Sequence, residues 1–440
     1  MTPRRANVVM PVVVPVVAAA IIGTILVAFL SPGFSLGQGA RAGVVRIYAS
    51  VPAITYVSII HGVQMALDEA GNTANGVQIE FRPLNDAIPP GAKESWDAEI
   101  ELGNARQAVA DPQAVAYIGT YTSGAAKLSI PVLNRVHMAM ISPGNTYVGL
   151  TKPNTGVAGE PWVYFPLGTR NFFRVVPADD LQGAAGAAYA AKQLGAKSFY
   201  TVDDTELYGH GIAVIFDSTA RALGLQSHNP GGNGSRGFNG KAIDVNSQAG
   251  LVAADIMKSQ PPPDLVYFGG NASNHPGQIL SALRTAGFTG TFLGGDSMIE
   301  QQFIDEAGEG TTPVYATLVG LPAKKLQPWY DTYKQRWSDD KNEDFAPFGY
   351  EAGKVAITAI SKVGPQGSRS LDDYREAIRA AVAAVKSSDL PNGTILGPPW
   401  QFDANGDTTL GVISVKQLSA GGWEYKNRMT GSKTEWQIAP

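Results

Sequence analysis

The sequence predicts an α/β fold made of two doubly wound parallel sheets. From Val44 onward, short runs of β-branched and aromatic residues alternate with stretches of helical periodicity, which is typical of a parallel sheet covered by helices. The chain has 440 residues, a length that indicates two or three domains rather than one. Hydrophobic residues make up 44% of the chain, enough to bury a substantial core.

Taken in order, the expected strands and helices alternate along nearly the whole chain. Strands are expected at 44–49, 77–81, 114–118, 136–141, 198–202, 265–268, 291–293, 314–319, 412–415 and 423–425. Helices are expected at 59–70, 101–110, from Gly124 onward, and at 181–194, 211–223, 247–259, 278–286, 300–307, 329–337, 349–361 and 371–385. The stretch 151–169 is rich in Pro and Gly and is expected to be a surface loop.

Composition excludes several classes of function. The formal net charge of −4 argues against a nucleic-acid-binding surface. The chain has no cysteine, so disulfides, thiolate metal sites, cysteine nucleophiles and a lipid-modified N-terminal cysteine are excluded. The five histidines, at positions 61, 137, 210, 228 and 275, show no metal-ligand spacing, and we expect no metal or other cofactor.

Residues 1–43 are predicted to form a signal anchor and a flexible tether. Arg4 and Arg5 precede an uncharged apolar run at 8–30, which as a helix would measure about 35 Å and cross a hydrocarbon core of about 30 Å. The basic side should remain in the cytoplasm. The rest of the chain is therefore expected outside the cytoplasm, in the periplasm or on the outer face of the cell membrane. A small-x-small sequence at 40–42 leaves cleavage and secretion as the alternative.

Two consecutive predicted strands end in small, hydroxylated turns. The run 114–118 leads through Gly119 and Thr120 to Ser123, and the run 136–141 leads into Ser142-Pro143-Gly144-Asn145-Thr146. In an open parallel sheet, ligands bind at the carboxyl ends of the strands, where helix N-termini present free N–H groups. Hydroxyl and amide groups with no general base nearby can hold a carboxylate but have little means of attacking one. The stretch 118–146 therefore predicts half of a binding site for a small anion, or else two helix caps at Ser123 and Thr146.

Seven short blocks, each weak alone, carry a resemblance when taken in order. They are I-G-x-x-x-S at 118–123, M-I-S-P-x-x-T at 140–146, D-x-x-x-Y-G-x-G at 204–211, D-L-V-Y-F-G-G at 264–270, G-Q-I-L with R-T-A-G at 277–287, G-G-D at 294–296 and G-P-P-W-Q-F-D-A-N-G-D at 397–407. Over nearly everything after Val44, the chain resembles the leucine/isoleucine/valine-binding family of periplasmic binding proteins. These are the extracytoplasmic substrate-binding proteins of ABC importers for branched-chain amino acids.

The resemblance implies an architecture and a function. It implies two Rossmann-like lobes joined by three crossovers near Val176, Leu321 and Pro398, which close on a ligand like a hinge. Lobe one would be 44–175 plus 321–397, and lobe two 176–320 plus 398–440. The implied function is not enzymatic: the protein would capture an amino acid of the branched-chain type, or an analogue, for an ABC transporter permease.

The resemblance also implies how the ends of the ligand are held. Ser123 and Thr146 match the serine and threonine that hold the α-carboxylate, and Gly144 and Asn145 match the backbone between them. Asp296 matches the acidic residue that holds the α-ammonium. This agrees with the chemistry of the residues, because a zwitterion needs hydroxyl and N–H donors at one end and an ionised carboxylate at the other.

Further residues are expected around the ligand's side chain, with some departures from the family pattern. Tyr208 matches a tyrosine that closes over the ligand. Asn271 stands where leucine-type members have an aromatic residue, and Tyr121 where they have an aliphatic one, so leucine itself is in doubt. Tyr56 and Tyr350 are expected to line the side-chain pocket.

Two other functions stay open at the level of sequence. A sensory module that binds an amide, urea or aromatic acid would suit an uncleaved anchor. A nucleotide-dependent enzyme would rest on the literal G-x-G-x-x-G at 232–237. That fingerprint requires a strand directly before it and a helix directly after it, and the flanking residues favour a flexible loop instead. Asp203 and Asp204 are likewise better interpreted as caps at a strand end than as a catalytic pair.

Overall fold

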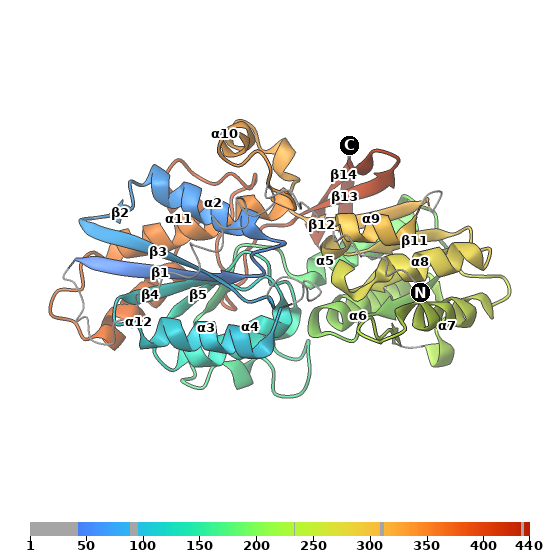
Figure 1. Ribbon diagram of the computed structural model, residues 1–440, viewed down its shortest axis with the longest axis horizontal. Helices are drawn as coiled ribbons and strands as arrows, with labels where there is room; N and C mark the ends of the chain where they lie inside the picture. The colour runs from blue at the N-terminus through green and yellow to red at the C-terminus, as the bar shows by residue number, and fades with distance from the viewer. Residues whose placement is uncertain (1–42, 89–95, 233, 309–311, 433–434) are drawn as a thin grey trace, which may run out of the picture. The chain divides into compact units, whose positions relative to one another are not determined.

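The computed structural model describes residues 43–88, 96–232, 234–308, 312–432 and 435–440. The predicted signal anchor and tether lies outside these residues, apart from Gly43. Within the described ranges, no helix combines the length and the apolar character needed to cross a membrane. The described chain forms two sheets, each flanked by helices on both faces (Figure 1).

The first sheet belongs to the N-terminal half of the chain and is parallel except at one edge. Its strands lie in the order β2-β3-β1-β4-β5-β6, and only the short β2 runs antiparallel to its neighbour. Their bounds are β1 Val44–Val51, β2 Thr73–Ala74, β3 Val77–Asn85, β4 Ala114–Gly119, β5 Ala139–Ser142 and β6 Phe172–Arg174. β4 is buried along its whole length, as expected for a central parallel strand.

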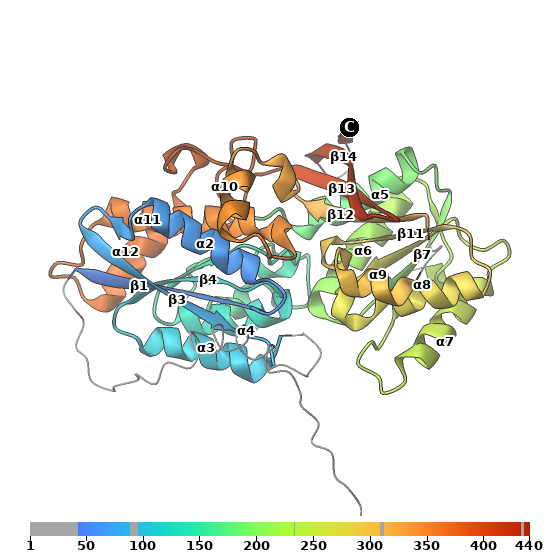
Figure 2. The same ribbon diagram turned by 45° about the horizontal axis from the view of Figure 1, so that its top comes forward.

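Helices cover both faces of this sheet (Figures 1 and 2). On one face lie α2 (Val57–Glu69), α11 (Ala346–Val363) and α12 (Leu371–Ala383), and on the other α3 (Ala98–Ala110) and α4 (Ser123–Asn134). Capping side chains help to set the helix starts: the Asp97 carboxylate accepts the N–H groups of Glu99 and Ile100 at the start of α3. Gly364, with φ +71°, follows the last residue of α11.

The second sheet is longer and mixed. Its main path is β15-β14-β13-β12-β11-β10-β7-β8, with β9 beside β7. The bounds are β7 Ser198–Asp203, β8 Gln226–Ser227, β9 Arg236–Gly237, β10 Leu265–Gly269, β11 Thr291–Gly294, β12 Val314–Val319, β13 Val412–Ser419, β14 Gly422–Ser432 and β15 Glu435–Ala439. One face carries α5 (Asp179–Lys192) and α6 (Leu207–Ala222), the other α7 (Val245–Met257), α8 (Pro276–Thr285) and α9 (Gln301–Ala307).

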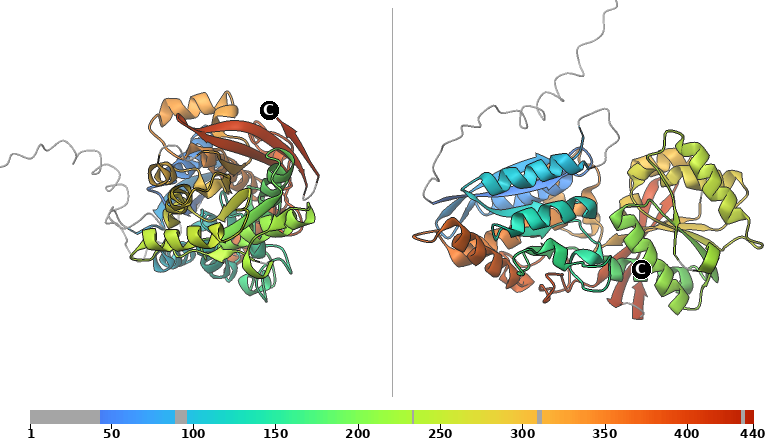
Figure 3. Two further views of the ribbon diagram at one scale, coloured as in Figure 1. Left: turned by 90° about the vertical axis from the view of Figure 1, so that its right-hand side faces the viewer. Right: turned by 90° about the horizontal axis from the view of Figure 1, so that it is seen from below.

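The C-terminal strands depart from the predicted parallel sheet. β13, β14 and β15 pair antiparallel with one another, and β13 pairs antiparallel with β12. Only Ala420 and Gly421 separate β13 from β14, and a connection this short joins antiparallel strands, whereas parallel strands need a long crossover. The ribbon of β13 and β14 is visible in red in Figure 3. The expected strands and helices are otherwise confirmed, and the described chain adds the short strands β2, β6, β8 and β9 and the terminal strand β15.

The chain passes between the two sheets three times. It leaves the first sheet after β6, returns after β12 through α10 (Trp329–Arg336) to α11 and α12, and enters the second sheet again at β13. The lobe limits stay a prediction. Phe402 packs against Phe173 of β6, with ring centroids 5.4 Å apart, so the chain is still beside the first sheet at this point. We therefore propose that the third passage lies near Val412 rather than near Pro398.

The predicted surface loop at 151–169 is a loop, but its inner side is fixed. The buried Glu160 carboxylate accepts the Tyr147 hydroxyl at 2.9 Å and the Val157 N–H at 2.9 Å. Phe165 is buried in the core beneath it, whereas Trp162 is more than half exposed. The expectation of a surface loop is therefore right for its outer side only.

Candidate ligand-binding cleft

The two hydroxylated turns lie side by side at one edge of the first sheet. β4 and β5 are parallel neighbours, so their carboxyl ends meet there and carry the turns 119–123 and 142–147. The Asn145 side-chain amide donates to the Tyr121 carbonyl at 2.9 Å and joins the two turns. Ser123 and Thr146 are each only 2% exposed. The structure thus brings together these residues in the way that the sequence predicted.

The backbone around Gly144 and Asn145 is organised by two neighbouring side chains. The Ser142 hydroxyl oxygen accepts the N–H groups of Gly144 at 3.2 Å and Asn145 at 2.8 Å. The Arg174 guanidinium donates to the carbonyls of Asn145 at 3.1 Å and Tyr147 at 2.9 Å. Arg174 was not singled out in the sequence, because an arginine that follows an aromatic strand carries no distinctive pattern.

Asp296 and Tyr208 face this edge from the second lobe. Asp296 opens a 3₁₀ turn (Asp296–Met298) directly after β11, and its Oδ1 accepts the Tyr208 hydroxyl at 2.9 Å and the Ser297 N–H at 2.8 Å. Its Oδ2 is buried without a hydrogen-bond partner in the described part of the chain. Burial raises the pKa of Asp296 to about 6, and the hydrogen bond from Tyr208 acts in the opposite direction.

A second buried carboxylate, Asp179, belongs to the same group. Asp179 is the first residue of α5 and fully buried, and its N–H donates to the Thr146 carbonyl at 2.8 Å. Among the described residues, neither of its carboxylate oxygens has a hydrogen-bond partner. Burial, and then the negative charge of Asp296, raise the pKa of Asp179 well above its usual range. In the sequence it resembles any acidic residue in the first turn of a helix.

Aromatic side chains fill the space between the lobes. The rings of Tyr56 and Tyr121 are stacked with centroids 3.6 Å apart, and Phe345 meets Tyr121 edge-on at 5.0 Å. Among the hydrogen bonds that cross between the lobes, Tyr56 donates to Glu300, and the hydroxyl groups of Tyr121 and Ser297 lie 3.0 Å apart. These contacts hold the cleft in a closed arrangement.

Little open space is left beside these rings. One cavity touches Tyr56 and Asp296 and another touches Tyr121 and Asn271, each of about 20 Å³, room for roughly one water molecule. The Asn271 N–H is held by the Asp204 carboxylate at 2.9 Å. Tyr56, Tyr121 and Asn271 therefore meet where the sequence predicted a side-chain pocket, and Tyr121 occupies much of it.

Tyr350 does not join this group. Its hydroxyl donates to Glu69 at 2.5 Å, and its ring lines a different cavity of the first lobe. Tyr350 follows Phe345 by five positions, which rotates a side chain by about 140° around a helix axis. Because Phe345 faces the cleft, Tyr350 cannot face it as well.

The weaker sequence signals do not form sites. The loop at 234–235 leads into the short strand β9 rather than into a helix, so the glycine-rich motif lacks the context of a dinucleotide site. Asp203 and Asp204 accept the N–H groups of Thr205 and Glu206, as caps do. In the described ranges, no cluster of three histidine or acidic residues is arranged to hold a metal ion.

The chain has two α/β lobes around a closed cleft, with hydroxyl groups on one side and buried carboxylates on the other. This arrangement defines a class of ligand-binding protein. A family model described as "Periplasmic binding protein" matches residues 41–420. The chain belongs to this family, which confirms the resemblance seen in the sequence. Membership implies an extracytoplasmic location.

Two curated relatives match part of the chain. An "Amino acid binding protein" of Pseudomonas aeruginosa is 24% identical over 243 residues, 54% of this chain and 55% of the relative. A "Leu/Ile/Val-binding protein BraC3" of Rhizobium johnstonii is 26% identical over 247 residues, 55% of this chain and 57% of the relative. The matched regions thus span just over half of the length of each relative.

Solved structures share the fold over most of the chain. A leucine-binding protein LivK from Thermotoga maritima aligns with a TM-score of 0.68 and 22% identity, covering 87% of this chain and 98% of its own. A solute-binding protein of an R. palustris ABC transporter, in complex with benzoate, aligns with a TM-score of 0.63 and 17% identity, covering 87% and 95%. At these identities the likeness establishes the two-lobe fold.

Proposed function

We propose that this protein captures an amino acid in the cleft between its lobes and presents it to the permease of an ABC importer, without catalysing a reaction. The observation that carries the proposal is the pair of buried carboxylates, Asp296 and Asp179. Three of their four oxygens have no hydrogen-bond partner among the described residues. Uncompensated buried carboxylates are unfavourable, and an ammonium group with three donors would satisfy them.

The opposite end of the ligand would meet the turns of the first lobe. Ser123 and Thr146 offer hydroxyl groups next to the start of α4, where free N–H groups favour an anion. We propose that these two side chains, with the backbone of Gly144 and Asn145, hold the α-carboxylate. The Asp179 N–H donates to the Thr146 carbonyl at 2.8 Å, so the residues proposed for the two ends of the ligand are neighbours.

The ligand's side chain would lie among Tyr56, Tyr121, Asn271 and Phe345, with Tyr208 closing the cleft. The names of the relatives support an amino acid of the branched-chain type or an analogue. Tyr121 must move for such a ligand to enter, because its ring occupies the space beside Asn271. We further propose that the N-terminal apolar run anchors the protein at the outer face of the membrane.

A sensory or uptake receptor for an amide, urea or an aromatic acid is the second candidate. The aromatic rings of Tyr56, Tyr121 and Phe345 favour it, because they would stack on a flat ligand. The R. palustris protein bound to benzoate supports the same possibility for this fold. Such a ligand has no ammonium group and would leave Asp296 and Asp179 unpaired.

A thermal-shift screen tests both candidates. The panel comprises the twenty amino acids, urea, short amides and benzoate, each applied to the wild type and to Asp296→Asn. A ligand at a hundred times its dissociation constant adds roughly 2.7 kcal/mol of stability. We expect a shift with amino acids of one class in the wild type that Asp296→Asn abolishes. Shifts with benzoate or amides alone, equal in both proteins, would favour the second candidate and reject the first.

A further inference from the structure

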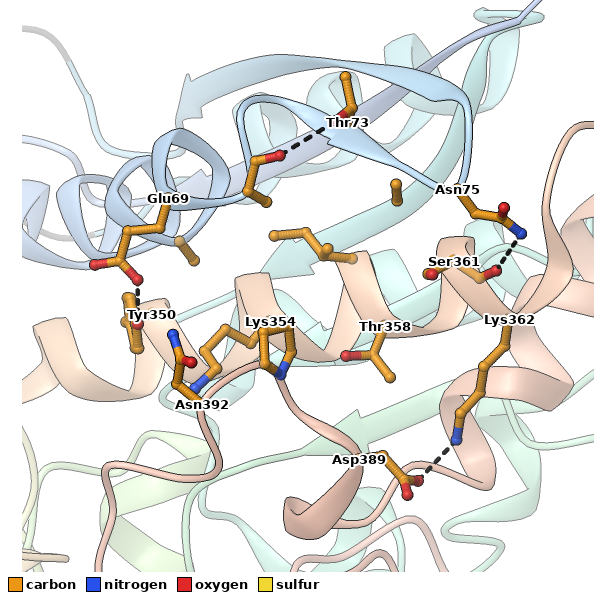
Figure 4. A pocket seen from close by; sticks show the side chains of 15 residues that line it. Glu69, Thr73, Asn75, Tyr350, Lys354, Thr358, Ser361, Lys362, Asp389 and Asn392 are labelled. Carbon is orange, nitrogen blue, oxygen red and sulfur yellow. Dashed lines mark hydrogen bonds and ion pairs between the residues drawn. The ribbon is translucent and has the colours of Figure 1, made fainter.

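A cavity of about 430 Å³ lies in the first lobe, outside the cleft between the lobes. Its walls come from the C-terminal half of α2, from β2, from α11 and from the loop 389–392 (Figure 4). Cavities that hold small molecules commonly measure about 300–1,000 Å³. This cavity is therefore far larger than either of the two in the cleft.

The packing of α2 against α11 explains where the cavity forms. The two helices touch at backbone distance, because a Cβ at Gly62 would collide with the Ala346 carbonyl and one at Gly349 with the Ile59 carbonyl. At its C-terminal end, α2 contributes Ala66 and Glu69 to the cavity lining, and Ala70 follows directly after the helix. Glu69 is held at one end by the Tyr350 hydroxyl. The short side chains of Ala66 and Ala70 leave the space between the helix ends unfilled.

One polar stripe of α11 faces this space. Tyr350, Lys354, Thr358 and Lys362 follow one another at intervals of four residues, which places them on one side of the helix. Figure 4 shows Lys354 and Thr358 in the middle of this stripe, with Glu69 and Tyr350 at one end and the Lys362–Asp389 pair at the other. The stripe is polar although most of α11 is buried.

Lys354 is the unusual member of the stripe. It is only 3% exposed, its ammonium donates to the Gly393 carbonyl, and it lies 5.0 Å from the centre of the Tyr350 ring. No carboxylate in the described part of the chain comes within 4.0 Å of it, whereas Lys362 pairs with Asp389 at 2.7 Å. Burial lowers the pKa of Lys354, as expected for a charge without a close counter-ion.

Thr358 supplies a second polar group without a partner. Its hydroxyl oxygen is buried and makes no hydrogen bond with any described residue, and the side chain is 6% exposed. Thr358 lies one helical turn from Lys354, so one small group can meet both. The rest of the wall is mixed: Ala66, Ala70 and Ile357 supply apolar surface, and polar groups come from Asn75, Ser361 and Asn392.

We propose that this cavity is a second ligand site, which takes a small molecule with a single carboxylate and a short aliphatic body. The carboxylate accepts hydrogen bonds from the Lys354 ammonium and the Thr358 hydroxyl, and the body packs against Ala66, Ala70 and Ile357. Polyanions are disfavoured, because Glu69 and Asp389 balance the two lysines of the lining. The site depends on the first lobe alone and does not rest on the function proposed for the cleft.

Sodium butyrate is the probe, and the Ile357 and Thr358 methyl groups are the reporters. In methyl-labelled full-length protein, NMR titration with butyrate should shift these two signals saturably, whereas 1-butanol should not. Lys354→Met should weaken binding by about tenfold or more. The matched control Lys127→Met changes an exposed lysine on α4, outside the lining of the cavity, and should leave the affinity within about twofold.

Two further variants distinguish binding in this cavity from a loss of fold and from binding in the cleft. Thr358→Val keeps the shape of the side chain and should also weaken butyrate binding, while its melting temperature shows whether the fold is intact. Thr146→Val, which removes a hydroxyl group proposed to hold a carboxylate in the cleft, should bind butyrate like the wild type. The proposal is overturned if no saturable shift occurs, if folded Lys354→Met and Thr358→Val both bind as the wild type does, or if Thr146→Val abolishes the shift.

Discussion

Asp296 and Asp179 are buried in the cleft, where we propose that they hold the positive end of a zwitterion, and two predictions concern Asp296. Replacing it by asparagine keeps the size of the side chain and removes the charge. If an ammonium group binds there, Asp296→Asn should lower the affinity by roughly 2–5 kcal/mol, the usual loss when one partner of a buried charge pair is removed. Isothermal titration calorimetry with the ligand found by screening measures this loss.

The matched control for that variant is Asp255→Asn. Asp255 is a surface carboxylate, paired with Arg236 and Lys258. Its replacement by asparagine should change the affinity by less than about 0.5 kcal/mol. An unchanged affinity in Asp296→Asn would show that this carboxylate does not contact the ligand, and it would contradict the assignment of a zwitterion.

The pKa of Asp296 leads to a second prediction, on stability. Burial raises the folded-state pKa from 3.8 to about 6. Between about pH 4 and 6 the folded protein therefore keeps a proton that the unfolded chain has lost, so stability without ligand falls as pH rises through this window. Two pKa units correspond to about 3 kcal/mol.

Urea unfolding at several pH values measures this effect as a difference between two proteins. The free energy of unfolding of the wild type, minus that of Asp296→Asn, should fall by about 3 kcal/mol from pH 4 to pH 7 and then stay level. Taking the difference removes the contribution of carboxyl groups that do not interact with Asp296, whereas the coupled titration of Asp179 stays in the difference. A difference that does not change with pH would contradict the assignment of this titration to Asp296.

At the scale of elements, Arg174 at the end of β6 connects the binding turn to the last passage between the sheets. Its guanidinium is fully buried, donates to Asp407 at 2.7 Å, and holds the carbonyls of Asn145 and Tyr147. Arg174→Met should destabilise the protein by roughly 3–5 kcal/mol, because it leaves the buried Asp407 carboxylate without its main partner. Chemical denaturation measures the loss.

The control for Arg174 is another arginine with a single carboxylate partner. Arg236 pairs with Asp255 at the surface of the second lobe, and Arg236→Met should cost no more than about 1 kcal/mol. Similar losses in the two variants would show that the buried network around Arg174 adds nothing beyond an ordinary surface pair.

The elements also show which features of the site could be predicted from the sequence and which could not. The turns after β4 and β5 were predicted correctly, because a strand end followed by glycine and hydroxyl residues is a local pattern. Tyr350 was placed in the side-chain pocket, and the structure puts it beside Glu69 instead. Which side of α11 faces the cleft depends on how that helix packs against α2, and no local pattern contains that information.

At the scale of the whole described molecule, hydrogen bonds between the lobes stabilise the closed cleft, and the bond from Tyr56 to Glu300 is one of them. Tyr56→Phe removes the bond to Glu300 and keeps the ring stacked on Tyr121. We expect the closed form to lose about 1 kcal/mol relative to an open form, a roughly fivefold shift in their ratio. The distance between fluorescent labels on the two lobes, measured in single molecules without ligand, reports this shift.

A tyrosine hydroxyl within one lobe provides the control. Tyr374 donates to the Gly364 carbonyl at 2.8 Å inside the first lobe, so Tyr374→Phe should leave the ratio of open to closed forms unchanged. If Tyr56→Phe behaves like this control, the contact with Glu300 does not hold the lobes together.

The sequence by itself determined the α/β class, the order of nearly all the elements, the two hydroxylated turns and the family. These follow from periodicity, from turn residues and from short blocks of neighbours, all of which are local in the chain. Only the tertiary structure decided that Asp179 lies beside Asp296 and Thr146, that Tyr121 lines the cleft, and that Lys354 is buried with no described carboxylate within 4.0 Å. Each of these depends on side chains far apart in the sequence, whose distances and burial are set by the packing of the sheets and helices.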